Sequence, residues 1–137
     1  MVNAAGTETN RCDLGGQPDS LAVAPDNSFV SIAIENERDE DLGDGRTGQM
    51  PAGFLVMVDL TDEGLLNCDT LRSVEMTGLA EVSPEDPEPE YVSINALGET
   101  VVTLQENNHM VVVSKEGEIV SHFSAGTVDL AGIDATD

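Results

Sequence analysis

The chain has 137 residues, enough for one domain with a sizeable core, and 27 acidic residues face only 5 basic ones, for a formal net charge of -22. Nucleic acid and anionic membrane surfaces are excluded as expected partners, because binding to either depends on clustered Lys and Arg. Three explanations of the acidity stay open: adaptation to high salt, the solubility of a secreted protein, or a surface that collects divalent cations.

The pattern of the first part of the chain predicts a single strand followed by a β-hairpin. Residues 9–14, TNRCDL, have the pattern of a last strand that leads into a Gly-Gly turn. The next segment, PDSLAVAPDNSFVSIAIEN (18–36), reads as two apolar strands joined by turn residues. An acidic insertion, ERDEDLGDGRTGQMPA (37–52), separates this hairpin from a third strand in GFLVMVDL and a fourth in LRSVEM.

The hairpin is repeated later in the chain, as PEYVSINALGETVVTLQEN (89–107). At an ungapped offset of 71, apolar residues fall on apolar residues and both copies end in Glu-Asn. The matched positions are Pro18 with Pro89, Asp19 with Glu90, Val30 with Val101, Glu35 with Glu106, and Asn36 with Asn107. Removing the sixteen inserted residues then aligns Val56 with Val111, so a third strand follows in each unit, and GEIVSHF (117–123) forms the fourth.

Four short strands to a unit are typical of a propeller blade, and the sequence predicts an all-β fold, a β-propeller fragment of about two four-stranded antiparallel blades. An open twisted sheet or sandwich of seven or eight strands would satisfy the same alternation. No helix is expected, because the one candidate, residues 61–73, is interrupted by Gly64 and lacks a 3.6-residue period.

The predicted organisation has five segments. They are the outer strand of a preceding blade (1–14), a blade (15–78) with the acidic insertion 37–52, an acidic Pro-rich linker (79–90), a second blade (91–124), and the start of a further blade (125–137). A closed propeller needs about four or more blades, so we expect further propeller blades or another copy of the chain as partners.

The long acidic connections are predicted to share one edge of the sheets, because antiparallel strands reverse at every turn and their connections alternate between two edges. Clustered carboxylates with neighbouring glycines suit calcium, although the order D-E-D-L-G-D-G is not an EF-hand loop and a solvated acidic loop is the alternative. The candidate metal ligands are Glu35, Glu37, Asp39, Asp41, Asp44 and Glu106, with Asn36 and Asn107 as further rim ligands or as caps of strand ends.

The remaining chemistry-bearing residues carry weaker signals. Cys12 and Cys68 would form a disulfide in an oxidising compartment and stay free thiols elsewhere. His109 and His122 are interpreted as ordinary strand residues. No catalytic residue is predicted, since the chain has no nucleophile elbow, Walker loop or dinucleotide fingerprint. The N-terminus lacks the pattern of a signal peptide, and no apolar run reaches the roughly 18 residues of a membrane span, so no membrane insertion is expected.

Residues 10–137 resemble the secreted bacterial β-propellers related to YVTN-type repeats, in the phytase-like, esterase-like phytase or alkaline-phosphatase-like group. The phrases that carry the resemblance are GGQPDSLAVAPD, AIENERDEDLGDG, PAGFLVMVDL, PEPEYVSIN and VTLQENNHMVVVS. Members are typically exported and several hundred residues long, so the resemblance implies an extracellular or periplasmic location and an internal portion of such a protein. It also implies either a calcium-assisted phosphoester hydrolase or a non-catalytic surface propeller.

The sequence therefore predicts a non-enzymatic β-propeller module of a secreted protein, with an acidic, calcium-binding loop face that binds a small ligand or a protein. The alternative is part of a metal-dependent phosphatase or phytase-like phosphoester hydrolase, in which bound cations would offset the carboxylates and activate water.

Overall fold

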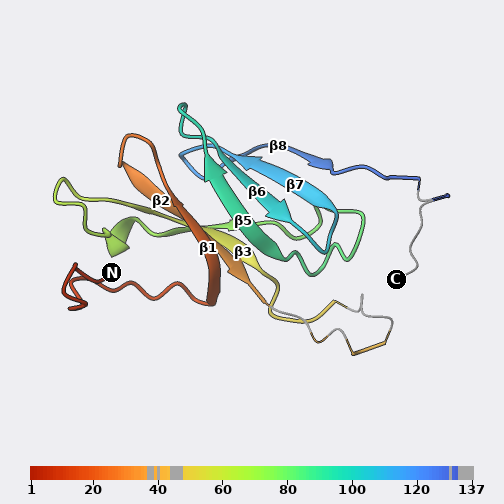
Figure 1. Cartoon of the computed structure of the whole chain (residues 1–137), viewed down its shortest axis with the longest axis horizontal. Helices are drawn as coiled ribbons and strands as arrows, with labels where there is room; N and C mark the ends of the chain where they lie inside the picture. Colours follow the sequence, from red (N-terminus) through yellow and green to blue (C-terminus); the bar gives the residue numbers. More distant parts are fainter. Residues whose placement is uncertain (37–38, 40, 44–47, 130, 133–137) are drawn as a thin grey trace.

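The protein is all-β and consists of two four-stranded antiparallel sheets, as the sequence predicts (Figure 1). This computed structural model describes residues 1–36, 39, 41–43, 48–129 and 131–132. Strands that follow one another in the chain also pair in each sheet. The first sheet contains β1 (Gln17–Val23), β2 (Phe29–Glu35), β3 (Phe54–Asp59) and β4 (Arg72–Glu75), and the second contains β5 (Pro89–Ile94), β6 (Thr100–Leu104), β7 (His109–Val113) and β8 (Ile119–Ser124).

The only helical element in the described ranges is a short 3₁₀ turn, η1 (Cys68–Thr70), before β4. No helix in that part of the chain has the length and hydropathy needed to cross a bilayer. The strand ends follow local turn chemistry. In the β1–β2 turn, for example, Asp26 Oδ1 accepts a hydrogen bond from the Ser28 amide at 3.0 Å, and Asn27 adopts a left-handed φ of 58°.

The repeat is confirmed, but its offset changes within the hairpin. Val23 pairs with Val30 in the first sheet, and Ile94 pairs with Thr100 in the second. Ile94 lies 71 residues after Val23, whereas Thr100 lies 70 residues after Val30, because the turn between β5 and β6 is one residue shorter. The predicted matches in the second strand are therefore wrong by one position: the first-sheet residues Val30, Glu35 and Asn36 correspond to Thr100, Gln105 and Glu106.

The predicted match of the third strands is confirmed. Val56 pairs with Ile32, and Val111 pairs with Val102, which is the residue that corresponds to Ile32. The same registers make Leu55, the residue before Val56 in β3, equivalent to Met110, the residue before Val111 in β7.

The two sheets are stacked with a shared apolar core between them, and β5 lies beside β1 and β2 (Figure 1). We call the surface of the first sheet that faces the second its front, and the opposite surface its back. The front contributes Phe29, Leu55, Met57, Val74 and Met76, and the second sheet contributes Val102, Leu104, Val111 and Val113. Leu55, Met57, Val102 and Val111 have no solvent exposure, so this interface is dry at its centre.

A second core covers the back of the first sheet. It contains Val30, Ile32, Ile34, Val56 and Val58, with Cys12, Leu14, Leu60, Leu66 and Leu71 packed against them. Residues 9–14 do not form the expected strand; they run as an irregular arm whose apolar side chains cover β2 and β3. With cores on both surfaces, six of the seven residues of β2 are buried.

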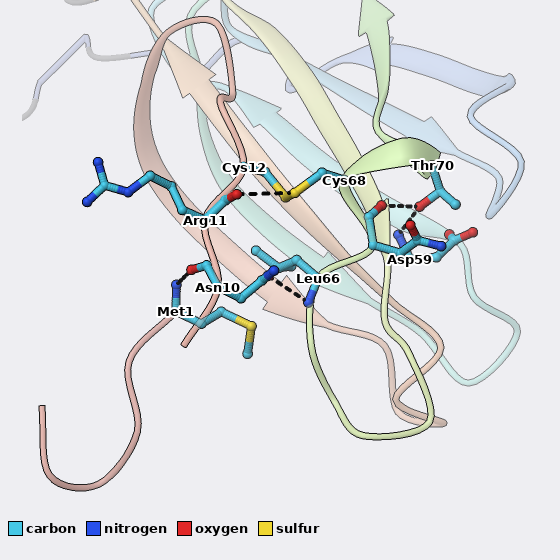
Figure 2. The surroundings of a disulfide bond; sticks show 9 residues. Met1, Asn10, Arg11, Cys12, Asp59, Leu66, Cys68 and Thr70 are labelled. Carbon is cyan, nitrogen blue, oxygen red and sulfur yellow. Dashed lines mark hydrogen bonds between the residues drawn. A yellow bond between two sulfur atoms is a disulfide. The ribbon is translucent and has the colours of Figure 1, made fainter. Parts of the chain in front are cut away.

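A disulfide fixes this arm (Figure 2). Cys12 and Cys68 are joined, which resolves the two alternatives left by the sequence in favour of the oxidised pair. Next to it, Asn10 Oδ1 accepts a hydrogen bond from the Leu66 amide at 3.0 Å. The Arg11 carbonyl oxygen lies 3.3 Å from Cys68 Sγ, but this is a contact only, because a disulfide sulfur carries no proton.

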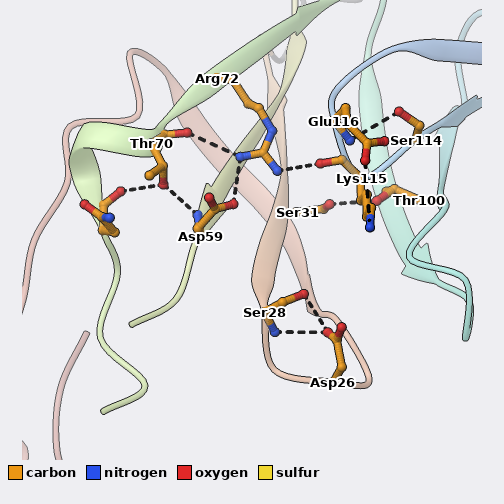
Figure 3. A network of polar contacts seen from close by, with 11 residues as sticks. Asp26, Ser28, Ser31, Asp59, Thr70, Arg72, Thr100, Ser114, Lys115 and Glu116 are labelled. Atoms are coloured by element: carbon orange, nitrogen blue, oxygen red, sulfur yellow. Dashed lines mark hydrogen bonds and ion pairs between the residues drawn. The ribbon is translucent and has the colours of Figure 1, made fainter. Parts of the chain in front are cut away.

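Arg72 joins the two sheets at the edge where the short turns lie (Figure 3). Its guanidinium donates to Asp59 Oδ1 at 2.9 Å within the first sheet and to the Lys115 carbonyl oxygen at 2.6 Å in the β7–β8 turn of the second. The same group stands 5.9 Å from the centre of the Phe29 ring. Deeper in the interface, the hydroxyls of Ser31 and Thr100 lie 2.8 Å apart.

Candidate metal centre

Three glutamates meet at the opposite edge, where the long connections lie. Glu35 ends β2, Glu90 lies in β5, and Glu106 lies in the turn after β6. One carboxylate oxygen from each lies within 4.8 Å of the other two, and all three residues are partly buried. Because Glu35 comes from the first sheet and the other two from the second, this glutamate cluster bridges the two sheets.

The segment before Glu90 is held in place by a buried asparagine. Asn107 is 1% exposed, and its side-chain amide donates to the carbonyl oxygen of Asp86 at 3.0 Å while its Oδ1 accepts from the Glu88 amide at 2.9 Å. Asp86 and Glu88 are buried as well. Residues 86–89, part of the predicted acidic Pro-rich linker, are therefore packed into the protein. The reason is tertiary: one side chain satisfies the backbone of the segment.

Close packing at Gly53 brings β2 and β5 together. A Cβ atom built on Gly53 would lie 2.6 Å from the Pro87 carbonyl oxygen and 2.7 Å from that of Ile34, so only glycine fits. The Gly53 amide donates to the Pro87 carbonyl oxygen at 3.0 Å. On the other side, the Ser20 hydroxyl of β1 donates to the Glu90 carbonyl oxygen. These contacts place Glu90 next to the end of β2.

The cluster is electrostatically strained. Burial raises the pKa of Glu35 to about 7, with further contributions from the nearby negative charges of Asp19 and Glu90. The pKa of Glu90 is also raised, first by burial and then by Glu106. Oε2 of Glu106 is inaccessible to solvent and has no hydrogen-bond partner among the described residues. Among the described residues, the cationic side chains of Arg11, Arg72 and Lys115 form ion pairs with carboxylates outside the cluster.

The predicted ligands divide into three groups. Glu35 and Glu106 lie in the cluster. Asp39 and Asp41 lie outside it, where the Asp41 amide donates to Asp39 Oδ1 at 3.0 Å and both side chains are exposed. Glu37 and Asp44 fall outside the described residues.

The side chains of the two predicted rim asparagines, Asn36 and Asn107, bind backbone. Asn36 Nδ2 donates to the Gln49 carbonyl oxygen at 3.5 Å, and both polar atoms of the Asn107 side chain are occupied by segment 82–88. A role of these two residues as rim ligands stays a prediction, and the contacts of Asn107 fit the alternative in which the side chain satisfies loose backbone groups. Sequence reasoning also missed Glu90, although the match of Asp19 with Glu90 at an offset of 71, which holds for β1 and β5, carried the signal.

Two other groups of polar residues, a cleft at the short-turn edge and a pair of histidines, already form hydrogen bonds or ion pairs within the protein. An open cleft at the short-turn edge is lined by Asp26, Asp59, Arg72 and Lys115, but Arg72 is committed to Asp59 and to backbone oxygens. His109 Nε2 lies 2.9 Å from His122 Nδ1 across β7 and β8. Burial, and then the neighbouring ring, lowers the pKa of His109.

Comparison with known proteins identifies the family. No curated protein and no solved structure matches the chain. The narrower resemblance to phytase-like propellers therefore stays a prediction. Residues 1–137 match the choice-of-anchor I domain, and the chain belongs to that family.

Proposed function

We propose that this chain is a non-enzymatic β-propeller module of an exported, surface-located protein, and that it binds a divalent cation, calcium, at the glutamate cluster. The family assignment supports a β-rich surface module. The Cys12–Cys68 disulfide supports an oxidising, extracytoplasmic location, because such bonds persist where thiols are not kept reduced.

The observation that carries the cation proposal is the approach of three carboxylates to within 4.8 Å with no described cation beside them. Like charges at this distance repel, and either a proton or a metal ion offsets them. The pKa of Glu35, about 7, is the signature of the proton alternative, so a cation competes with a weakly held proton at neutral pH.

Ligand type and size favour calcium among the divalent cations. Carboxylate oxygens are hard ligands, and calcium holds six to eight of them at about 2.3–2.6 Å in flexible geometry. Oxygens on opposite sides of the ion are then up to about 5 Å apart, a span that the three glutamates already satisfy. Backbone oxygens and water would complete the shell. The hydrolase alternative has no supporting contact among the described residues and stays a prediction.

Isothermal titration calorimetry of the intact chain with calcium chloride tests this proposal. We expect a dissociation constant of about 0.1–1 mM, the range of extracellular modules, and a thermal midpoint that rises with calcium. Glu35→Gln combined with Glu90→Gln should weaken binding at least about tenfold, because two of three charged ligands are lost. Glu118→Gln, which removes a charge from the exposed β7–β8 turn, is the matched control and should leave binding unchanged.

Two results would contradict the proposal. One is the absence of heat and of any thermal shift in the unmodified chain at about ten times the expected dissociation constant. The other is equal loss of binding in Glu118→Gln and in the double variant, which would indicate a diffuse effect of net charge. Asp39→Asn with Asp41→Asn separates the insertion from the cluster, and we expect it to retain binding.

A further inference from the structure

The second sheet has an uncharged surface that nothing in the described structure covers. On β6 and β7, residues with buried side chains alternate with half-buried ones, so one surface packs on the first sheet and the other faces outward. Tyr91 and Phe123 on the flanking strands are 63% and 50% exposed. We call this outward surface the open face; it comprises Tyr91, Ser93, Val101, Thr103, Met110, Val112, Ser121 and Phe123.

The composition of the open face is unusual for this chain. None of its eight residues is charged, although the chain carries 27 acidic and 5 basic residues. Its apolar residues pair across the strands, Val101 with Val112 and Met110 with Phe123, and exposed apolar surface on an otherwise highly charged protein marks an interaction site. The surface is formed by the middle of the strands, so its shape is fixed by the ladder of the sheet and not by loops.

The internal repeat shows what covers an open face of this type. The registers make five of its residues equivalent to residues on the front of the first sheet, and all five of those are buried under the second sheet. The pairs are Val101 with Ser31, Thr103 with Ala33, Met110 with Leu55, Val112 with Met57, and Phe123 with Val74. In the first sheet these positions are 0% to 5% exposed, because Val102, Leu104, Val111 and Val113 pack against that surface.

We propose that the open face docks a further four-stranded antiparallel blade, stacked on the second sheet as the second sheet is stacked on the first. The occupant presents β-branched and aliphatic side chains from its two middle strands, as the second sheet does with Val102 and Val111. One polar contact of the first interface is not repeated on the open face. The Ser31 hydroxyl meets Thr100 in the first interface, but Val101 replaces Ser31 on the open face, so the incoming blade carries an apolar residue at the position equivalent to Thr100.

A second copy of this chain fits the open face less well. To stack in the same way, it would have to present the back of its first sheet, and that surface is already covered by Cys12 and Leu14 of the disulfide-linked arm. The net charge of -22 on each copy also opposes association. A further blade joined to β8 meets neither obstacle. The chain leaves β8 much as it leaves β4, with a glycine at positive φ soon after each strand, Gly78 and Gly126.

An extended chain tests the proposal. Ser124 is equivalent to Glu75, so a duplicate of residues 76–124 joined directly after Ser124 supplies one more blade with the native connection. The duplicate carries Thr100→Val to match Val101. We expect one cooperative transition and a monomeric protein. Val112→Asp in the original part should lower the thermal midpoint of the extended chain by about 10 °C or more, because it buries a charge, and that of the unextended chain, where Val112 is half-buried, by about 5 °C or less.

Engineered disulfides test the geometry of the stack. Ser31→Cys with Thr100→Cys in the unextended chain is the positive control, since those two hydroxyls already touch. In the extended chain, Val101→Cys should form the corresponding disulfide with a cysteine placed at the Thr100 position of the duplicate, as shown by loss of free thiols and by peptide mapping. A control that closes while the test pair stays open would overturn the proposal, and so would a duplicate that stays protease-sensitive. Sedimentation of the unextended chain decides the remaining occupant: a dimer abolished by Val112→Asp would assign the open face to a second copy and refute a further blade.

Discussion

Removing the Cys12–Cys68 disulfide should destabilise the protein by about 4 kcal/mol. The cysteines are 56 residues apart, and in the chain-entropy account a cross-link over a loop of this length lowers the free energy of the folded state relative to the unfolded chain by about 4 kcal/mol. The bond also holds the arm over the back of the first sheet, where Val56 and Val58 are fully buried beneath it. Because domains of this size are stable by only about 5–15 kcal/mol, the loss is a large share of the total.

Urea unfolding of Cys12→Ser with Cys68→Ser against the unmodified chain measures this loss. Serine is close to cysteine in size, so the variant removes the cross-link with little change in packing. Reductant should destabilise the unmodified chain by the same amount and leave the double variant unchanged. A loss below about 1 kcal/mol would refute the reasoning, since it would mean that the arm is held over the second core by packing alone.

Three further predictions concern the edges of the sheets. Gly53→Ala should lower the free energy of unfolding by about 2 kcal/mol or more and weaken calcium binding, because the new methyl group meets the carbonyl oxygens of Pro87 and Ile34. Gly64→Ala, in open space but at a φ of +75°, should cost only about 1 kcal/mol, and urea unfolding and calorimetry on both variants check this. Arg72→Met should lower the free energy of unfolding by about 2 kcal/mol in urea, because the charge-assisted hydrogen bonds of Arg72 are lost. Asp59→Asn removes only the half-exposed partner and should lower it by less than about 1 kcal/mol. Equal losses would mean that Arg72 stabilises the first sheet and not the contact between the two sheets. The raised pKa of Glu35 means that the folded state binds this proton more tightly than the unfolded chain, so its contribution to stability is complete below the ordinary pKa of 4.5 and is lost as pH rises through about 7. After solvent screening, we expect the free energy of unfolding without calcium to fall by about 1–2 kcal/mol between pH 4.5 and 7.5. Glu35→Gln should flatten this pH dependence.

The strands and their order could be predicted from the sequence because the signals are local. Turn chemistry marks the hairpins in both units: Asn27 and Gly98 occupy corresponding positions at positive φ. Apolar runs between such turns then give the strands. The register of β2 against β6 could not be predicted in this way. In β2 six of seven residues are buried, so no alternation of apolar and polar residues distinguishes an offset of 71 from one of 70.

The glutamate cluster was predicted in part for a related reason. Connections between antiparallel strands alternate between the two edges of a sheet, and this alternation brings Glu35 and Glu106 to one edge; the inference needs only the strand order. Glu90 depends on the packing of residues 86–89, which is set by a side chain 18 or more residues further along, Asn107. Composition alone describes such a segment as a linker, because it contains no information on the partner that satisfies its backbone.

The corrected register also predicts how many calcium ions a longer stack binds. Asp19 and Glu90, which occupy equivalent positions on β1 and β5, both raise the pKa of Glu35. In the next interface the residue equivalent to Glu35 is Gln105, so the extended chain would reproduce only two of the three cluster carboxylates, the duplicates of Glu90 and Glu106, while the original Glu90 takes the place of Asp19. We therefore expect calorimetry of the extended chain to give one calcium ion per molecule, and Gln105→Glu to add a second. Two ions without that substitution would mean that two carboxylates suffice, and one ion with it would mean that the new boundary does not reproduce the first.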